Sequence, residues 1–367
     1  MEINLKRFVD IDIQSKVISS STSERDTVVL LSSEGQSENN KIYSSLKEFN
    51  SDPNTSSLTK TKKYAEMYFS NGGLKLDVRY KIASNTDIVS EIKKLPYNEI
   101  VVAYCGTYSE MKTAATTITA SKGSVGSINS TYGINQKILL GRTTSAEDCS
   151  GIDNFAVKVS AIEGSEMTIA AYLSRINIYG VNSIHDYAFT VESFSTQDLT
   201  NIVNDDTILG NTLDNNMNID MELAGAIRNL GGNLTNGLDL VNQYTLIVLH
   251  QTITDRLLKL LTQKIKGQSG VNSIYTTIVD ELSRYVTNGY LTTDKVWKDE
   301  TKTLSYNNQT YTLIEKDQAL VLGYHIVVLP LSALSEEDKA KRKCPPIYIF
   351  LADSYGIRNI TINGEVI

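Results

Sequence analysis

Both ends of the chain carry strand signals that have no strand beside them in the sequence. Near the start, apolar residues recur at odd positions, namely Ile3, Leu5, Val9, Ile11 and Ile13. Near the end, the apolar positions of an extended tail are Ile357, Ile360, Ile362 and Val366. A period of two is typical of a half-buried strand. Because neither strand has a hairpin partner, each must pair with a distant strand or another molecule, or remain an exposed edge.

Two interpretations of these terminal strands stay open from the residues alone. In the first, each is an edge strand of the chain's own sheet, as terminal strands commonly are. In the second, each is an arm that adds to the sheet of a neighbouring subunit, the β-augmentation mode of recognition. The polar run Ser19–Ser23 separates the first strand signal from the body and reads as a linker.

The body of the chain alternates helix and strand signals. We expect strands at 27–31, 74–82, 99–104, 137–141 and 155–161. Between them we expect helices at 41–50, 59–70, 86–95 (with Thr86 or Asp87 as N-cap) and 109–120. This alternation predicts an α/β fold, in mixed α+β form, with a mixed or parallel sheet flanked by helices.

Further along, the periodicity predicts a helix at 166–179, a strand at 186–193 and a helix-tending segment at 196–213. Residues 233–242 form a region rich in Gly and Asn, which we expect to be irregular. Two strong helices follow at 251–266 and 271–288, with Gly289 at the C-cap position. Residues 291–322 look β-rich, with a turn at Asn307-Asn308, and the last expected strands are 325–329 and 347–351.

Composition narrows the classes of function. At 367 residues the chain is long enough for two domains. A net charge of −7 argues against a nucleic-acid partner, since phosphate-binding surfaces are normally basic. No apolar run approaches the roughly 20 residues that span a bilayer, so we expect no membrane insertion. The three cysteines are widely spaced, and the first residues lack the apolar core of a signal peptide, so a reducing compartment is expected.

No catalytic, cofactor or metal constellation is recognisable. The sequence lacks a P-loop and a GxSxG nucleophile elbow. The three histidines, His185, His250 and His325, have no second ligand at metal-binding spacing. Residues 214–220 resemble the start of a calcium loop, but Ile219 and Gly225 stand where that loop needs Gly and Glu, so we expect a solvated loop. We therefore expect no cofactor and no enzymatic activity.

One charged segment, Ser335–Lys343, supports two interpretations. Ser335 with Asp338 fits a capping box, and acids before bases suit the helix dipole, so it is consistent with a solvated helix. Alternatively, four cations form a basic face for an acidic partner, namely Lys339, Lys341, Arg342 and Lys343. Crowding of these like charges would be relieved by carboxylates of the partner.

Taken in order, these features resemble the contractile tail sheath proteins of bacteriophages and of related contractile injection particles. The resemblance lies in the N-terminal INLKRFVDIDI, in VDELSRYVTNGYL, and in VVLPLSALSEEDKAKRKCPPIYIFLADSYGIRNITINGEVI. It is most specific over the first 15 residues and over residues 240–367. The middle of the chain matches only as a general α/β layer.

The resemblance implies a division of labour along the chain. Residues 1–20 and 353–367 would be arms that add strands to neighbouring subunits. Residues 21–200 would form an α/β domain, and 201–352 the core domain, packed with the N-terminal strand region. The charged segment, with Lys339, Lys341, Arg342 and Lys343, would face a tail tube.

The resemblance also implies how such a chain works. Subunits would form a helical homopolymer around the tube, with baseplate and tail terminator proteins as further partners. Contraction would drive the tube through a cell envelope without any cofactor. The expected location is a virion tail, assembled in the bacterial cytoplasm.

Three rival interpretations remain: a tube component, a baseplate component, or an α/β enzyme with an unrecognised site. The repeated helix–strand pattern disfavours a tube protein, since tube proteins are usually shorter and mostly β. The residues do not separate a phage sheath from one of a bacteriocin-like or secretion-system particle.

Overall fold

The fold is seen in a computed structural model, which describes residues 27–96, 98–121, 137–178, 186–263, 266–352 and 354. The expected terminal arms, at 1–20 and 353–367, lie outside these residues apart from Ser354. So do all nine of the apolar arm positions, from Ile3 to Val366, and His185.

A mixed eight-stranded sheet organises the first part of the chain. Its strands are β1 (Thr27–Leu31), β2 (Lys41–Tyr43), β3 (Lys75–Arg79), β4 (Val101–Tyr104), β5 (Ile138–Thr143), β6 (Phe155–Val159), β7 (Asn218–Leu223) and β8 (Ala226–Leu230). They lie in the order β2-β3-β1-β4-β5-β6-β7-β8. The six inner strands are parallel, and β2 and β8 pair antiparallel at the two edges. The expected α/β class with a mixed sheet is confirmed.

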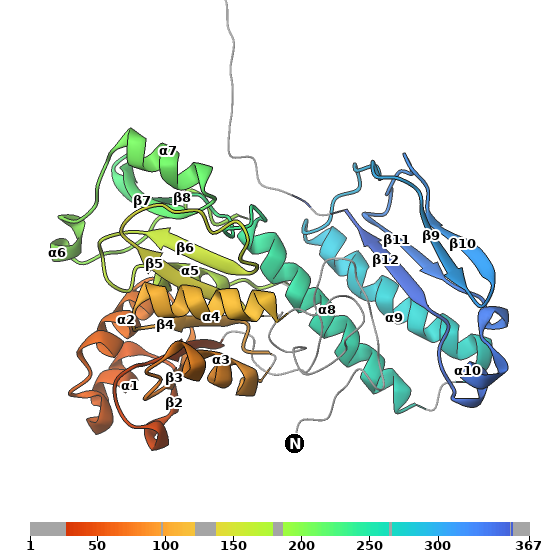
Figure 1. The fold of residues 1–367 in the computed structure, drawn as a ribbon, viewed down its shortest axis with the longest axis horizontal. Helices are drawn as coiled ribbons and strands as arrows, with labels where there is room; N and C mark the ends of the chain where they lie inside the picture. Colours follow the sequence, from red (N-terminus) through yellow and green to blue (C-terminus); the bar gives the residue numbers. More distant parts are fainter. Residues whose placement is uncertain are drawn as a thin grey trace, which may run out of the picture.

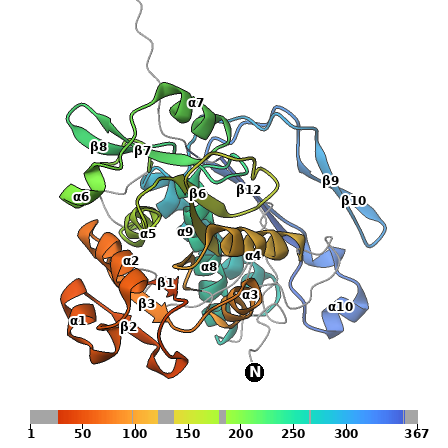
Figure 2. The same ribbon diagram turned by 60° about the vertical axis from the view of Figure 1, so that its left-hand side comes forward.

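Helices cover both faces of this sheet, which is why its strands are apolar on both sides. On one face, Val28 and Leu30 of β1 pack with α2 (Thr59–Ser70) and α5 (Met167–Ser174). On the other, Val29 and Leu31 pack with α3 (Asn85–Lys94) and α4 (Tyr108–Ala120). Figure 2 shows α4 and α2 on opposite sides of the strands. Three short helices lie at the margins, namely α1 (Leu46–Ser51), α6 (Thr196–Leu199) and α7 (Asp206–Asp214).

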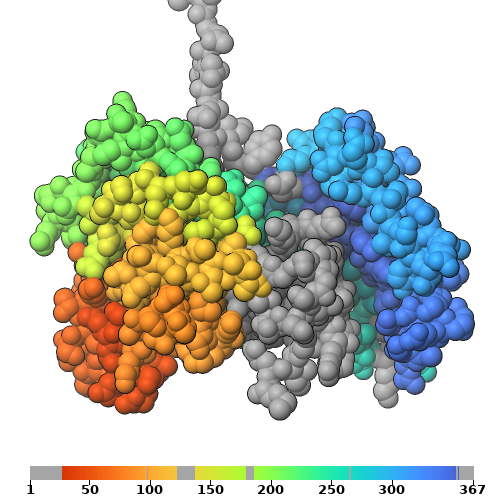
Figure 3. Space-filling view, viewed as in Figure 1, coloured from red at the N-terminus to blue at the C-terminus, as the bar shows by residue number. Residues whose placement is uncertain are grey.

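Two long helices join the sheet to the C-terminal part of the chain. Helix α8 (Leu240–Leu261) runs diagonally through the molecule and α9 (Gly267–Thr287) lies beside it (Figure 1). The α8 side chains Leu240, Ile247 and Ile253 belong to the same apolar core as α2, α5 and the sheet. The two parts therefore share one core, although their surfaces form separate lobes (Figure 3).

The C-terminal lobe holds two small antiparallel sheets. One is the hairpin β9 (Lys302–Tyr306) and β10 (Gln309–Ile314), whose turn uses Asn307 and Asn308 at positive φ, as expected for Asn in such turns. The other pairs β11 (Tyr324–Val328) with β12 (Ile347–Leu351). Between β11 and β12 lie a short 3₁₀ turn (Leu331–Ala333) and α10 (Glu336–Ala340).

Several sequence-based expectations are wrong in detail. The expected helix at 41–50 begins instead as β2, because residues 41–43 pair antiparallel with β3, and only then does Ser45 cap α1. Helix α3 is capped by Ser84, whose side chain accepts from the Asp87 N–H, rather than by Thr86 or Asp87.

Three further differences concern residues 186–240. The expected strand 186–193 is irregular and makes one isolated bridge, Val191 to Arg228. The loop expected at 214–220 becomes strand at Asn218, because β7 pairs there with β6. Helix α8 starts at Leu240, eleven residues before the expected 251, with Asp239 accepting from Asn242 N–H as its cap. The sheet continues to Leu230, so β7 and β8 belong with the strands that precede residue 200.

The inner strands should carry the stability of the sheet. We expect Leu30→Ala, in a fully buried position of β1, to lower the free energy of unfolding by about 2–5 kcal/mol, because it leaves a cavity between sheet and helices. Val321→Ala is the control, since Val321 is 68% exposed and its loss should cost about 0.5 kcal/mol or less. Denaturant unfolding followed by circular dichroism measures both; equal costs would contradict this assignment of the core.

Candidate functional site

The β11–β12 sheet is the first candidate surface. The two strands pair from Tyr324–Leu351 to Val328–Ile347, and within the described part of the chain neither pairs with a third strand. Several of their apolar side chains are only half buried, namely Ile326, Val327, Val328, Ile347 and Leu351. Isolated two-stranded sheets are marginally stable, and the described part of the chain supplies no further strand to this one.

The chain is anchored where it leaves β12. The backbone N–H of Ala352 donates to Gly323 O (2.9 Å), and Thr292 N–H donates to Ala352 O (2.8 Å). Ser354 continues this anchoring, because its N–H donates to Tyr290 O (3.2 Å) and its Oγ donates to Gly289 O (2.5 Å). The expected C-terminal arm therefore departs from a fixed point next to the end of α9.

The charged segment after β11 is the second candidate surface, and its helix is shorter than expected. Helix α10 ends at Ala340, so Lys339 lies within it and Lys341, Arg342 and Lys343 follow it. Lys343 N–H donates to Asp338 O, and Arg342 adopts φ +57°, as in a Schellman-type C-cap. The expected helix from Ser335 to Lys343 is wrong beyond residue 340, because this cap turns the chain towards Pro345.

Asp338 holds the segment in place. Its backbone N–H donates to the Ser335 hydroxyl (3.1 Å), and its carboxylate accepts from Ser335 and from the Tyr306 hydroxyl of β9 (3.2 Å). It also pairs with Lys343 (2.7 Å), and this contact holds the pKa of Asp338 below its usual value. Ser335 is confirmed as the N-cap. The Asp338 carboxylate, however, accepts from the Ser335 hydroxyl and not from the Ser335 backbone N–H that a capping box would use.

Most of the positive charge of this segment is neutralised locally. Lys339 pairs with Glu336 (2.7 Å), Lys341 with Glu337, and Lys343 with Asp338. Among the described residues, no carboxylate lies within ion-pair distance of Arg342, which is exposed. The expectation that a partner's carboxylates are needed to relieve four like charges is therefore too strong, because three of the four cations already have a partner in the segment.

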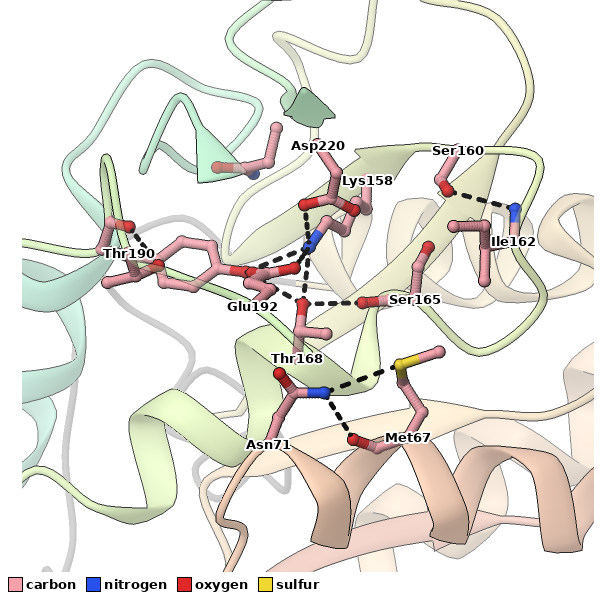
Figure 4. A network of polar contacts seen from close by, with 12 residues as sticks. Met67, Asn71, Lys158, Ser160, Ile162, Ser165, Thr168, Thr190, Glu192 and Asp220 are labelled. Carbon is pink, nitrogen blue, oxygen red and sulfur yellow. Dashed lines mark hydrogen bonds and ion pairs between the residues drawn. The ribbon is translucent and has the colours of Figure 1, made fainter. Parts of the chain in front are cut away.

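A buried polar network in the large sheet was missed by the sequence analysis. Lys158 of β6 is completely buried and its Nζ lies 2.7 Å from Asp220 Oδ1 of β7 (Figure 4). The same ammonium donates to the Glu192 carboxylate, to Thr168 Oγ1 (2.5 Å) and to the Tyr187 hydroxyl (3.3 Å). A lysine in the otherwise apolar strand FAVKV was the available signal.

This network binds an irregular segment to the sheet. Glu192 anchors residues 186–192 from inside, and Asn71 holds the next residue through two hydrogen bonds with the backbone of Ser193 (2.8 and 3.0 Å). Burial and the neighbouring Glu192 carboxylate raise the pKa of Asp220 well above its usual value. The two carboxylates raise the pKa of Lys158 against the effect of its burial, so the ammonium stays charged.

The remaining candidate chemistry is sparse. His325 lies with its Nε2 3.1 Å from Leu313 O and its Nδ1 3.2 Å from Gln318 Nε2, which is a structural arrangement. The described residues contain no group of three His, Cys, Asp or Glu side chains placed to hold a metal ion. Among the helices described, none has the length and apolarity to cross a membrane.

Comparisons with known proteins identify this arrangement. Residues 241–366 match the family model described as "E217 tail sheath protein gp31-like, C-terminal domain". The helical sheath of the anti-feeding prophage (AFP) in its contracted state aligns with 97% of this chain and 98% of its own, with a TM-score of 0.61 and 12% identity. The chain has the fold of a contractile sheath subunit. The resemblance to contractile tail sheath proteins is confirmed.

Two further solved structures are similar over the same extent. The contracted sheath of the extracellular contractile injection system PVC aligns with a TM-score of 0.63, 12% identity, and coverage of 97% of this chain and 96% of its own. A chain of the AFP baseplate in the contracted state aligns with a TM-score of 0.61, 13% identity, and coverage of 98% and 99%. No curated protein sequence matches the chain.

The buried network generates a prediction about pH. The pKa of Asp220 is raised in the folded state. The protonated group therefore contributes fully to the free energy of unfolding below its ordinary pKa of 3.8, and this contribution is lost as the pH rises towards the raised pKa. Asp220→Asn removes this titration. Relative to wild type, the variant should gain about 1.4 kcal/mol of unfolding free energy per pH unit across that window. Denaturant unfolding from pH 4 to 8 measures the difference.

Lys158→Met supplies the opposite control. It leaves two buried carboxylates without a cation and should cost about 3–5 kcal/mol at neutral pH, and less in acid, where both can be protonated. If the free energies of unfolding of wild type and Asp220→Asn changed in parallel with pH, Asp220 would not titrate in this range.

Proposed function

We propose that the chain is a structural subunit of a contractile sheath, which polymerises helically around a tail tube and contracts to drive the tube through a target cell envelope. The observation that carries this proposal is the alignment of nearly the whole chain with a helical sheath in its contracted state. The family match of residues 241–366 supports it independently from the sequence.

The mechanism needs assembly rather than chemistry. Contacts between different surfaces of identical subunits do not close on themselves and produce a helical filament. The extended sheath would be a metastable form of this filament. When subunits rotate outward and bury more intersubunit surface, the free energy released would shorten the sheath, with no cofactor and no nucleotide.

Strand exchange would link the subunits during this movement. The β11–β12 sheet offers free edges and half-buried apolar side chains, which fits the acceptor of an added strand. The donors would be the arms, residues 1–20 with Ile3, Leu5, Val9, Ile11 and Ile13, and residues 353–367 with Ile357, Ile360, Ile362 and Val366. Backbone hydrogen bonds to an added strand would persist while the bodies repack.

The charged segment would face the tube. Arg342 is its cation without a local carboxylate, so we propose that Arg342 makes the main contact with an acidic group of the tube, and that Lys339, Lys341 and Lys343 contribute less. The further partners would be baseplate and tail terminator proteins. The location would be a virion tail or tail-like particle, assembled in the bacterial cytoplasm.

The buried cluster of Lys158, Glu192 and Asp220 does not favour a catalytic function. Lys158, Glu192 and Asp220 are each 7% exposed or less, so no substrate can reach them from solvent. We propose that the chain is not an enzyme, and that this cluster has a structural role.

Removing the arms tests the proposal. Negative-stain electron microscopy of the full-length chain across a concentration series should show hollow, striated tubes of uniform width. Deleting residues 357–367, or separately 1–20, should leave a soluble monomer, because the linking strands are lost. A truncated chain that still formed normal tubes would disprove the arm mechanism; small discrete particles at every concentration of the full chain would count against a sheath.

A charge reversal tests the tube-facing segment. Arg342→Glu should weaken co-sedimentation of the sheath with the tube of the same particle by about tenfold, because it replaces an attraction with a repulsion. Lys298→Glu is the matched control, since Lys298 is 75% exposed and pairs with Asp317 beyond the open end of the β9–β10 hairpin, whereas the charged segment contacts Tyr306 at the turn end. Equal binding by both variants would show that the segment does not face the tube.

A further inference from the structure

We propose that two distant surfaces of this chain dock on each other between neighbouring copies. The first, called the acidic end, comprises Val191, Val203, Asp205, Asp206, Glu222 and Leu223. The second, called the basic turn, comprises Lys259, Leu261 and Lys266, where α8 gives way to α9. This contact rests on the proposed function in one respect, namely that the occupant of each surface is a second copy of the chain.

The acidic end is unusually rich in exposed apolar side chains. Of the fourteen large apolar residues that are exposed in the described part, seven lie between Phe189 and Leu223. Val191 is 60% exposed, Val203 50% and Leu223 44%. Contiguous apolar surface of this kind marks interaction sites in proteins.

Backbone contacts bring the segments that carry these three residues together. Val191 forms its bridge with Arg228 of β8, and the Arg228 guanidinium donates to Leu223 O (3.3 Å). Glu222 N–H donates to Asn204 Oδ1 (2.9 Å), which brings the loop with Val203 to the end of β7. The apolar residues therefore surround the β7–β8 turn, which Figure 1 shows beside α6 and α7.

Apart from Arg228, whose guanidinium donates to the carbonyls of Leu223 and Phe189, this part of the chain carries only negative charge. No Lys or Arg lies between Arg175 and Arg228, although this stretch contains eight Asp and Glu residues. Two of the eight are buried with Lys158, and Asp198 lies 3.8 Å from Lys63. Four others are exposed, and within the described residues they have no cation at ion-pair distance, namely Asp205, Asp206, Asp214 and Glu222.

The basic turn has the complementary composition. Between Asp255 and Asp280 the chain contains four Lys and Arg residues and no acid. Arg256 is used internally, with its Nε 3.0 Å from Glu281 Oε2. Lys259 and Lys266 are exposed and have no carboxylate beside them in the described part, and Leu261 between them is 39% exposed. An apolar residue flanked by cations without a nearby carboxylate matches an apolar surface flanked by carboxylates without a nearby cation. Of these carboxylates, Asp205 also caps α7, because it accepts from the N–H groups of Thr207 and Ile208.

The two surfaces cannot meet within one molecule, because Figure 1 shows them at opposite ends. Between copies, the contact joins two different surfaces and can repeat along a filament. The other basic region, around α10, is a poorer partner, since Glu336, Glu337 and Asp338 neutralise three of its four cations. Opposite charges also direct the encounter and reject a wrong register.

A charge swap tests the contact in the full-length chain. Asp206→Lys/Glu222→Lys and Lys259→Glu/Lys266→Glu should each raise the concentration of half-maximal tube assembly about tenfold or more, and Asp205 is left unchanged because it caps α7. The chain that carries both sets should assemble within about threefold of wild type, because each repulsion becomes an attraction again. Lys298→Glu, which changes an exposed cation that belongs to neither surface, should assemble normally. Circular dichroism and thermal unfolding confirm that each variant is folded.

The outcomes separate this contact from the proposed function. Wild-type tubes with normal assembly of both reversed variants would overturn the contact and leave the sheath function intact. Impaired variants without rescue in the swapped chain would also overturn it, since the two surfaces would then bind other occupants. A wild-type chain that stays monomeric at every concentration would contradict both the contact and the proposed function.

Discussion

The structure depends on α8 being buried on almost every side. Fifteen of its 22 residues are buried, so it requires partners on nearly every side, and the sheet, α5 and α9 provide the apolar ones. Polar residues are tolerated because Thr252 and Thr254 donate to carbonyls one turn earlier in α8, and Arg256 pairs with Glu281 of α9. One helix thus completes the core of the sheet and packs against the C-terminal lobe.

The two edges of the large sheet are each protected from pairing with other chains. At one end of the large sheet β2 has only three residues, and at the other the segment 186–192 covers β8, held by Lys158 and Asn71. Short or covered edges prevent uncontrolled pairing with other chains. The small sheet of β11 and β12 has no such cover among the described residues. The hairpin of β9 and β10 is likewise two-stranded, so under the proposed function added strands would be directed to the C-terminal lobe rather than to the large sheet.

Sequence reasoning succeeded where a local signal decides the structure. The strands at 27–31 and 347–351 and the helix at 59–70 have the expected bounds, because apolar period and flanking turns specify them. It failed where a partner distant in the sequence determines the local structure. Residues 41–43 become a strand only by pairing with β3, and residues 186–193 lie along β8 without regular pairing. At the charged segment, the i, i+4 spacing of Glu337 and Lys341 was an available signal of an internal ion pair that the sequence reasoning did not use. The arms lie outside the described residues.

Under the proposed function, the strengths of these contacts suit their different tasks. A surface that binds the tube and later releases it must bind weakly. In the charged segment three of the four cations are neutralised, so mainly Arg342 is left to make a contact, which is exposed and screened by salt. Linkages that survive contraction require strand pairing, whose backbone hydrogen bonds do not depend on how the bodies are oriented. Surfaces that change partners between the extended and contracted forms need both apolar area and charge, because the first supplies affinity and the second selects the register.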